Sequence, residues 1–227
     1  MSLVIAIDGP SGSGKSTLAR GVAQRLHLAY LDTGAMYRAA ALWVARNGAL
    51  DSPERMPGLV EAMDLVVGLD PDAPTLHLAG QEISQAIRAP ETSTMVSRVS
   101  TVIPVRHVML LHQRAIIARE RTSEGWAQGR GVVAEGRDIT TVVAPDADTR
   151  LLLTASPAIR LARRTAELAQ AGAAPSVAAM QDQVLRRDRD DATVAEFTAP
   201  APGVVLVDST TMDAAQTLDY VLGLVDR

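Results

Sequence analysis

The sequence contains no cysteine and a single lysine, Lys15, among its 227 residues. The lack of cysteine excludes disulfide bonds, thiolate metal sites and a cysteine nucleophile, and it suits a reducing compartment. No apolar run is long enough to span a bilayer, and the N-terminus lacks a basic segment followed by a long apolar stretch. We therefore expect a soluble cytoplasmic protein with no membrane partner.

Aromatic residues are also scarce, and the chain has no excess of positive charge. Aromatic residues make up 3% of the chain and hydrophobic residues 47%, so the core must be aliphatic. The net charge of −4 argues against general nucleic-acid binding, which favours a basic domain. The length fits one domain of ordinary size, or one core with an insertion, and we expect a monomer.

The one lysine lies in a phosphate-binding sequence. Residues 9–16 read GPSGSGKS and match G-x-x-x-x-G-K-[ST] at every fixed position. The apolar run Leu3–Ile7 precedes this loop, and a helical stripe of Leu18, Val22 and Leu26 follows it. Glycine N–H groups and the helix N-terminus bind phosphate oxygens in this context. The predicted nucleotide-binding residues are Gly9, Pro10, Ser11, Gly12, Ser13, Gly14, Lys15, Ser16 and Thr17, with the Ser16 hydroxyl placed for Mg²⁺.

Short apolar runs alternate with helical patterns along the chain. This alternation predicts an α/β fold, with helices on both faces of a five-stranded parallel sheet. The last run lies where an edge strand is expected, so we interpret Asp208 after it as structural. The expected strands are Leu3–Ile7, Leu28–Leu31, Val132–Ala134, Arg150–Thr154 and Val204–Val207.

One segment interrupts the alternation. Asp64–Leu69 and Thr75–Gly80 are strand-like and flank a proline-rich turn, which predicts a small antiparallel hairpin. We therefore expect an insertion over about 64–88 in a core of 1–63 and 89–227. Helices are expected over Thr92–Thr101 and Pro104–Thr122, and the charged segment 172–194 is predicted to form a helical lid.

The phosphate loop by itself serves ATPases, GTPases and kinases alike. The guanine-recognition sequence N-K-x-D is absent, which excludes the usual GTPase. A kinase with a phosphorylated acceptor needs positive charge for a second anion. Arg38 and Arg137 follow the second and third strands, at the edge where open α/β sheets bind ligands. Arg160 and Arg163 share a helix face; the pattern leaves their role open, and Arg160 is a candidate for the ATP site.

Several segments taken together resemble the bacterial cytidylate kinases, a family of P-loop nucleoside monophosphate kinases. The similarity covers nearly the whole chain and is most specific in Leu31–Arg38 (LDTGAMYR) and Glu135–Ile139 (EGRDI). It implies a three-layer P-loop kinase fold in which the insertion binds the monophosphate. It also implies transfer of a phosphoryl group from ATP to CMP or dCMP, with Mg²⁺, in pyrimidine nucleotide metabolism.

The resemblance also implies roles for individual residues. Ser97 and Arg106 would recognise cytosine, Asp191 would approach the sugar hydroxyls, and Lys15, Arg137 and Asp138 would be catalytic. The acidic residue that assists Mg²⁺ stays open between Asp32, Glu135 and Asp138. By motif match the CMP site comprises Thr33, Arg38, Ser97, Arg106, Arg137, Asp138, Arg187 and Asp191.

The lid departs from the family pattern R-D-x-x-D-x-x-R. Val194 occupies the position of the last arginine. Valine carries no charge for a phosphate, so either Arg186 or Arg189 takes over this contact or the affinity for the monophosphate is reduced.

Two alternatives remain from the sequence. One is a kinase of the same class with another acceptor, such as UMP, AMP or shikimate. The other is a nucleotide-dependent switch without transfer activity, although arginines for a second anion would then have no use.

Overall fold

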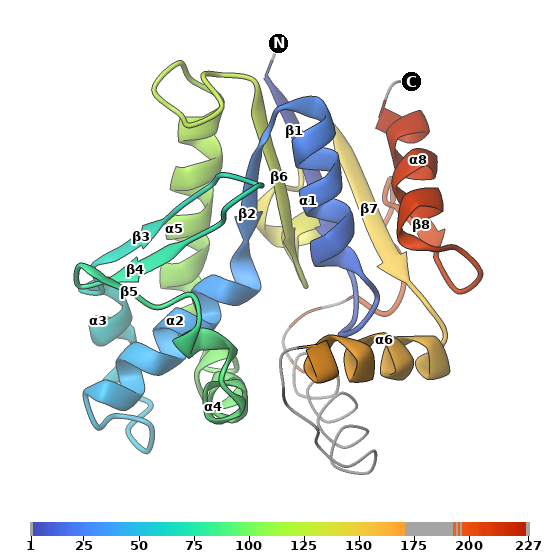
Figure 1. The fold of residues 1–227 in the computed structure, drawn as a ribbon. Helices are drawn as coiled ribbons and strands as arrows, with labels where there is room; N and C mark the ends of the chain where they lie inside the picture. Colours follow the sequence, from blue (N-terminus) through green and yellow to red (C-terminus); the bar gives the residue numbers. More distant parts are fainter. Residues whose placement is uncertain (1, 171–192, 194, 196, 226–227) are drawn as a thin grey trace.

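The computed structural model describes residues 2–170, 193, 195 and 197–225. Figure 1 shows a central sheet with helices packed on both sides and a smaller sheet beside it. In chain order the elements are β1 (Leu3–Asp8), α1 (Lys15–Leu26), β2 (Ala29–Asp32), α2 (Thr33–Arg46), α3 (Met56–Glu61), β3 (Leu65–Val67), β4 (Leu76–Leu78), β5 (Gln81–Glu82), η1 (Ala86–Arg88), α4 (Pro90–Ser100), α5 (Ile103–Glu120), β6 (Gly131–Gly136), η2 (Ile139–Val143), β7 (Thr149–Thr154), α6 (Pro157–Gln170), β8 (Val205–Asp208) and α8 (Ala214–Val225).

The central sheet has five parallel strands in the order β2-β6-β1-β7-β8. This confirms the predicted α/β fold, and β8 lies at an edge as expected. β1 is in the middle, and Val4, Ile5, Ala6 and Ile7 are completely buried. Parallel strands covered on both faces need apolar side chains in both directions, which explains the unbroken apolar runs.

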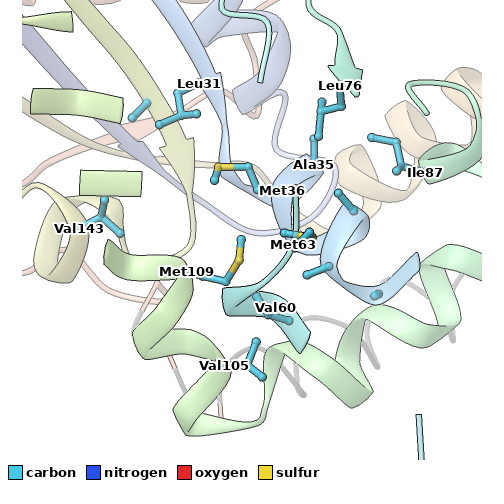
Figure 2. Packing of buried hydrophobic residues seen from close by; sticks show 14 of the residues in the cluster. Leu31, Ala35, Met36, Val60, Met63, Leu76, Ile87, Val105, Met109 and Val143 are labelled. Atoms are coloured by element: carbon cyan, nitrogen blue, oxygen red, sulfur yellow. The ribbon is translucent and has the colours of Figure 1, made fainter. Parts of the chain in front are cut away.

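Alternate side chains of β1 point into two separate hydrophobic cores. Ile5 and Ile7 pack with α1 and α8 on one face, and Val4 and Ala6 pack with α2 and α5 on the other. Figure 2 shows part of the second core, in which the labelled side chains are all aliphatic or methionine. The aliphatic core expected from the composition is therefore confirmed.

The small sheet contains the predicted hairpin and one further strand. β3, β4 and β5 pair antiparallel, with Leu78 opposite Gln81 across a two-residue turn. Both turn residues, Ala79 and Gly80, have positive φ angles, which the tight hairpin turn requires. The turn after β3 is tied to α1, because Arg20 Nε donates to the carbonyl of Pro71 at 3.2 Å.

Two helices follow the small sheet, near the predicted bounds. α4 and α5 correspond to the expected helices, and Pro104 lies in the first turn of α5. The sequence did not predict α3 or the π-helical turn η2. Almost all of the expected lid, 172–194, lies outside the described residues. None of the described helices is both long and apolar enough to cross a membrane.

η2 is held to the end of β1 by one buried carboxylate. Asp8 accepts from the backbone N–H groups of Ile139 and Thr140, each at 2.8 Å, and from the Thr140 hydroxyl at 2.6 Å. Burial raises the pKa of Asp8 above its usual value, although the three donors favour the charged form. This carboxylate therefore fixes the chain that leaves β6.

We expect Asp8→Ala to lower the free energy of unfolding by about 2 kcal/mol, because it leaves buried donors without an acceptor. Urea unfolding monitored by circular dichroism measures the change. Asp146→Ala is the control, since the Asp146 carboxylate is largely exposed. Equal stability of the two variants would contradict the structural role of Asp8.

Candidate active site

A cavity of about 570 Å³ lies at the carboxyl ends of β1, β2 and β6. The phosphate loop and the first turn of α1 line one part of it, and the starts of α2 and α5 line another. The small sheet, η1 and α4 add an apolar wall through Leu76, Ile87 and Val96. The position agrees with the rule that open α/β sheets bind ligands beyond the carboxyl ends of their strands.

The phosphate loop joins β1 to the N-terminus of α1, as predicted. Gly12 and Gly14 have φ angles of 74° and 91°, which glycine adopts without strain. A Cβ atom on Gly12 would lie 2.4 Å from the carbonyl oxygen of Arg160, so the loop packs directly on α6. The glycines therefore allow the backbone conformation of the loop, and α6 packs against it.

Lys15 is held above a buried carboxylate. Its Nζ lies 4.0 Å from Glu135 Oε2 at the end of β6 and 3.5 Å from the carbonyl of Pro10. Tyr30 donates its hydroxyl to Glu135 Oε1 at 3.0 Å, and Ser16 also hydrogen-bonds to this carboxylate. Burial, and then the charge of Asp32, raises the pKa of Glu135, while Lys15 opposes the rise. Lys15, Ser16 and Glu135 therefore form one compact polar group at the loop.

The start of α2 contributes Thr33 and Arg38. Asp32 caps this helix by accepting from Ala35 N at 2.7 Å, and its other oxygen lies 3.5 Å from Arg38 NH2. Thr33 donates to the carbonyl of Glu135 at 2.7 Å. Arg38 is mostly buried and lines the cavity, and its Nε atom has no hydrogen-bond partner among the described residues. A donor in this position is available to an anion.

Arg137 and Asp138 lie just beyond β6, where the sequence placed them. Arg137 NH1 donates to the carbonyl of Gly9 at 2.6 Å, and its guanidinium lies 4.6 Å from the centre of the Phe197 ring. Asp138 forms an ion pair with Arg106 from the first turn of α5. The structure thus brings Thr33, Arg38, Arg106, Arg137 and Asp138 to the same cavity.

Two of the arginines support the phosphate loop from behind. Arg160 NH1 donates to the carbonyl of Ser11 at 2.9 Å. Arg163 donates to the carbonyl of Ser13 at 3.0 Å and to both the hydroxyl and the carbonyl of Ser209 at 2.9 Å. The sequence left open whether these two residues lie at the surface, and the structure places both against the loop.

Three of the residues predicted for the CMP site are not among the described residues that line the cavity. Ser97 is half-buried on α4 and is not part of the cavity lining. Arg187 and Asp191 lie outside the described residues. By contrast Ser100, which sequence reasoning did not single out, does line the cavity. The available signal was its spacing of four residues from Val96, since such residues share a helix face.

Asp208, which the sequence analysis interpreted as structural, does not line the cavity. It is exposed at the end of β8, and it accepts from the backbone N–H and the hydroxyl of Thr210, which lowers its pKa. This geometry fits the structural role predicted for it. Within the part of the chain that the structure describes, no cluster of three or more histidine or acidic residues could hold a metal alone.

The family model and the relatives found by sequence agree on one family. The cytidylate kinase family model matches residues 5–227. A cytidylate kinase of Cutibacterium acnes is 47% identical over 225 residues, covering 98% of this chain and 96% of the relative. One of Solibacter usitatus is 42% identical over 228 residues, covering 98% and 92%. An uncharacterized protein from Eubacterium ventriosum shares the fold alone, with a TM-score of 0.52, 9% identity and 99% of each chain covered. The match to the family model and the relatives that align over nearly the full length show that this chain belongs to the cytidylate kinase family.

Proposed function

We propose that this protein transfers the γ-phosphoryl group of ATP to CMP or dCMP, forming ADP and CDP or dCDP. The observation that carries the proposal is one cavity lined by two cationic groups, Lys15 of the phosphate loop and the arginines Arg38, Arg106 and Arg137. A phosphoryl-transfer enzyme must hold two polyanions together in this way. Membership of the cytidylate kinase family supports CMP as the acceptor and ATP as the donor.

The loop end of the cavity would bind the ATP phosphates. Backbone N–H groups at the start of α1 and the Lys15 ammonium provide positive charge there. Ser16 and Glu135 also suit Mg²⁺, which prefers oxygen ligands, takes few from the protein and keeps several waters. Ser16 would hold the ion through its hydroxyl and Glu135 through its carboxylate. When bound, Mg²⁺ would neutralise charge on the phosphate oxygens.

The arginine end would bind the acceptor. Guanidinium groups bind phosphate oxygens through two parallel hydrogen bonds, which suits Arg38 and Arg137. Arg137 also contacts Gly9 of the phosphate loop, so it lies where the two phosphate groups would approach each other. The Arg106–Asp138 pair offers both donors and acceptors for a base.

The proposed chemistry depends on position and charge. The attacking oxygen of a nucleoside monophosphate is already ionised at neutral pH, so no strong general base is needed. Lys15, Arg38 and Arg137 would align the reacting oxygens and stabilise the charge that spreads over the transferring group.

A panel of acceptors tests the function as a whole. With ATP and Mg²⁺ in a coupled ADP assay, we expect CMP and dCMP to give the highest kcat/KM, ahead of UMP, AMP and shikimate. A better rate with one of the other acceptors would assign the protein to another acceptor. ATP binding without acceptor-dependent ADP formation would make it a switch.

Lys15→Met should leave the fold intact and reduce kcat by about 10²- to 10³-fold, because it removes a charge that stabilises the transition state. Arg25→Met, an exposed position of the same helix, is the matched control. Lys15 carries the only side-chain amine, so an acylating reagent reports directly on it beside the N-terminal amine. ATP should protect Lys15 from this reagent; near-normal turnover of the variant would refute its role.

Arg38→Met should raise the KM for CMP by about tenfold or more and leave the KM for ATP nearly unchanged, because the lost guanidinium faces the acceptor phosphate. Arg98→Met is the control, since Arg98 is half-exposed, pairs with Asp51 and does not line the cavity. Steady-state kinetics with each substrate varied separately measures both constants. Equal increases for CMP and ATP would argue against an acceptor-specific contact.

A further inference from the structure

We propose that Ser100 hydrogen-bonds to the pyrimidine base of the acceptor nucleotide and so determines part of the specificity of the site. This inference rests on the proposed function, since it assigns a further contact within the same cavity. The family resemblance assigns a base contact to Ser97, and Ser100 is another hydroxyl residue on the same helix, three positions later.

The hydroxyl of Ser100 is buried without a partner. The residue is 4% exposed, and its Oγ makes no hydrogen bond to any described residue. Buried polar side chains are nearly always satisfied, because an unsatisfied one loses its bonds to water and gains nothing in return. The free protein therefore carries an unfavourable group that a ligand would satisfy.

Ser100 lies on the cavity wall, next to a residue expected to bind the acceptor. It lines the cavity together with Val96, one helical turn earlier on α4. Arg106 NH1 donates to the backbone carbonyl of Ser100 at 3.2 Å, so the arginine and the hydroxyl share this wall. A second buried atom without a partner, Arg38 Nε, belongs to a side chain that lines the same cavity. Two such atoms on one cavity point to a polar ligand.

The surroundings of Ser100 suit a base better than a phosphate. Leu76, Ile87 and Val96 provide an apolar wall, and the first two belong to the buried cluster seen in Figure 2. Tyr37 adds an aromatic ring, with its centre 5.8 Å from the Arg106 guanidinium. A base has apolar faces and a polar edge, so it matches an apolar wall that carries a few hydrogen-bonding groups.

A hydroxyl at this place adds a capability that the Arg106–Asp138 pair lacks. Arg106 can only donate, and a carboxylate such as that of Asp138, which pairs with it, can only accept. A serine hydroxyl does both and rotates freely. The polar edge of cytosine has acceptors in its carbonyl and ring nitrogen and a donor in its amino group. Ser100 therefore complements the fixed Arg106–Asp138 pair.

The test uses a variant whose thermal stability without ligand should not fall, although a buried side chain is shortened. Ser100→Ala removes a group that is unsatisfied in the free enzyme, so its Tm without ligand should equal or exceed that of the unaltered protein. The same variant should bind CMP less well, with a KM for CMP about tenfold higher and a smaller rise in Tm on adding CMP. The KM for ATP should not change.

Two comparisons complete the experiment. Thr94→Ala removes an exposed hydroxyl of the same helix that already donates to the carbonyl of Glu91, and it should leave the KM for CMP unchanged. Ribose 5-phosphate serves as a probe without a base, and its binding to Ser100→Ala should equal that to the unaltered protein.

The outcomes separate the two proposals. If the unaltered protein neither binds nor phosphorylates CMP, the proposed function fails and this inference fails with it. If the unaltered protein uses CMP, three results overturn the role of Ser100 alone. These are an unchanged KM for CMP in Ser100→Ala, a lower Tm of the free variant, and an equal loss of affinity for ribose 5-phosphate.

Discussion

The parallel register between β1 and β6 is the constraint on which the site depends. It pairs Asp8 with Gly136, so the phosphate loop and the segment with Arg137 leave the sheet side by side. β2 pairs with β6 so that Asp32 lies opposite Glu135, which brings the start of α2 to the same edge. Parallel strands end at one edge together, and residues more than a hundred positions apart therefore form one cavity.

Buried charges keep the functional side chains in place at this edge. Asp8 holds the segment after β6, and Glu135 lies beneath Lys15 and Ser16. Burial disfavours the charged form of both carboxylates, and hydrogen-bond donors or a cation around each one offset part of this cost. Because these partners come from different elements, the carboxylates join the phosphate loop, β2, β6 and η2 into one unit. The alignment of phosphate-binding groups thus depends on residues that need not touch a phosphate.

Most of the central fold was predictable, and the reason lies in burial. A strand covered on both faces is an apolar run, which is visible in the sequence for the inner strands of the large sheet. The edge strand β8 is also an apolar run, although Val205 and Leu206 are exposed. Short elements lack such a pattern: β5 has two residues, and α3 contains Pro57 and Gly58. η2 was not predictable because the Asp8 carboxylate that holds it comes from 131 positions away.

The sequence by itself determined the phosphate loop, the sheet and the strand-end arginines, because local patterns and fixed motifs encode them. Tertiary structure alone decided how the arginines divide: Arg160 and Arg163 brace the loop from behind, while Arg38, Arg106 and Arg137 line the cavity. It also decided that Ser100 rather than Ser97 lines the cavity. Residues three apart occupy neighbouring positions on a helix, so only the packing of α4 against the rest of the protein determines which hydroxyl faces the ligand.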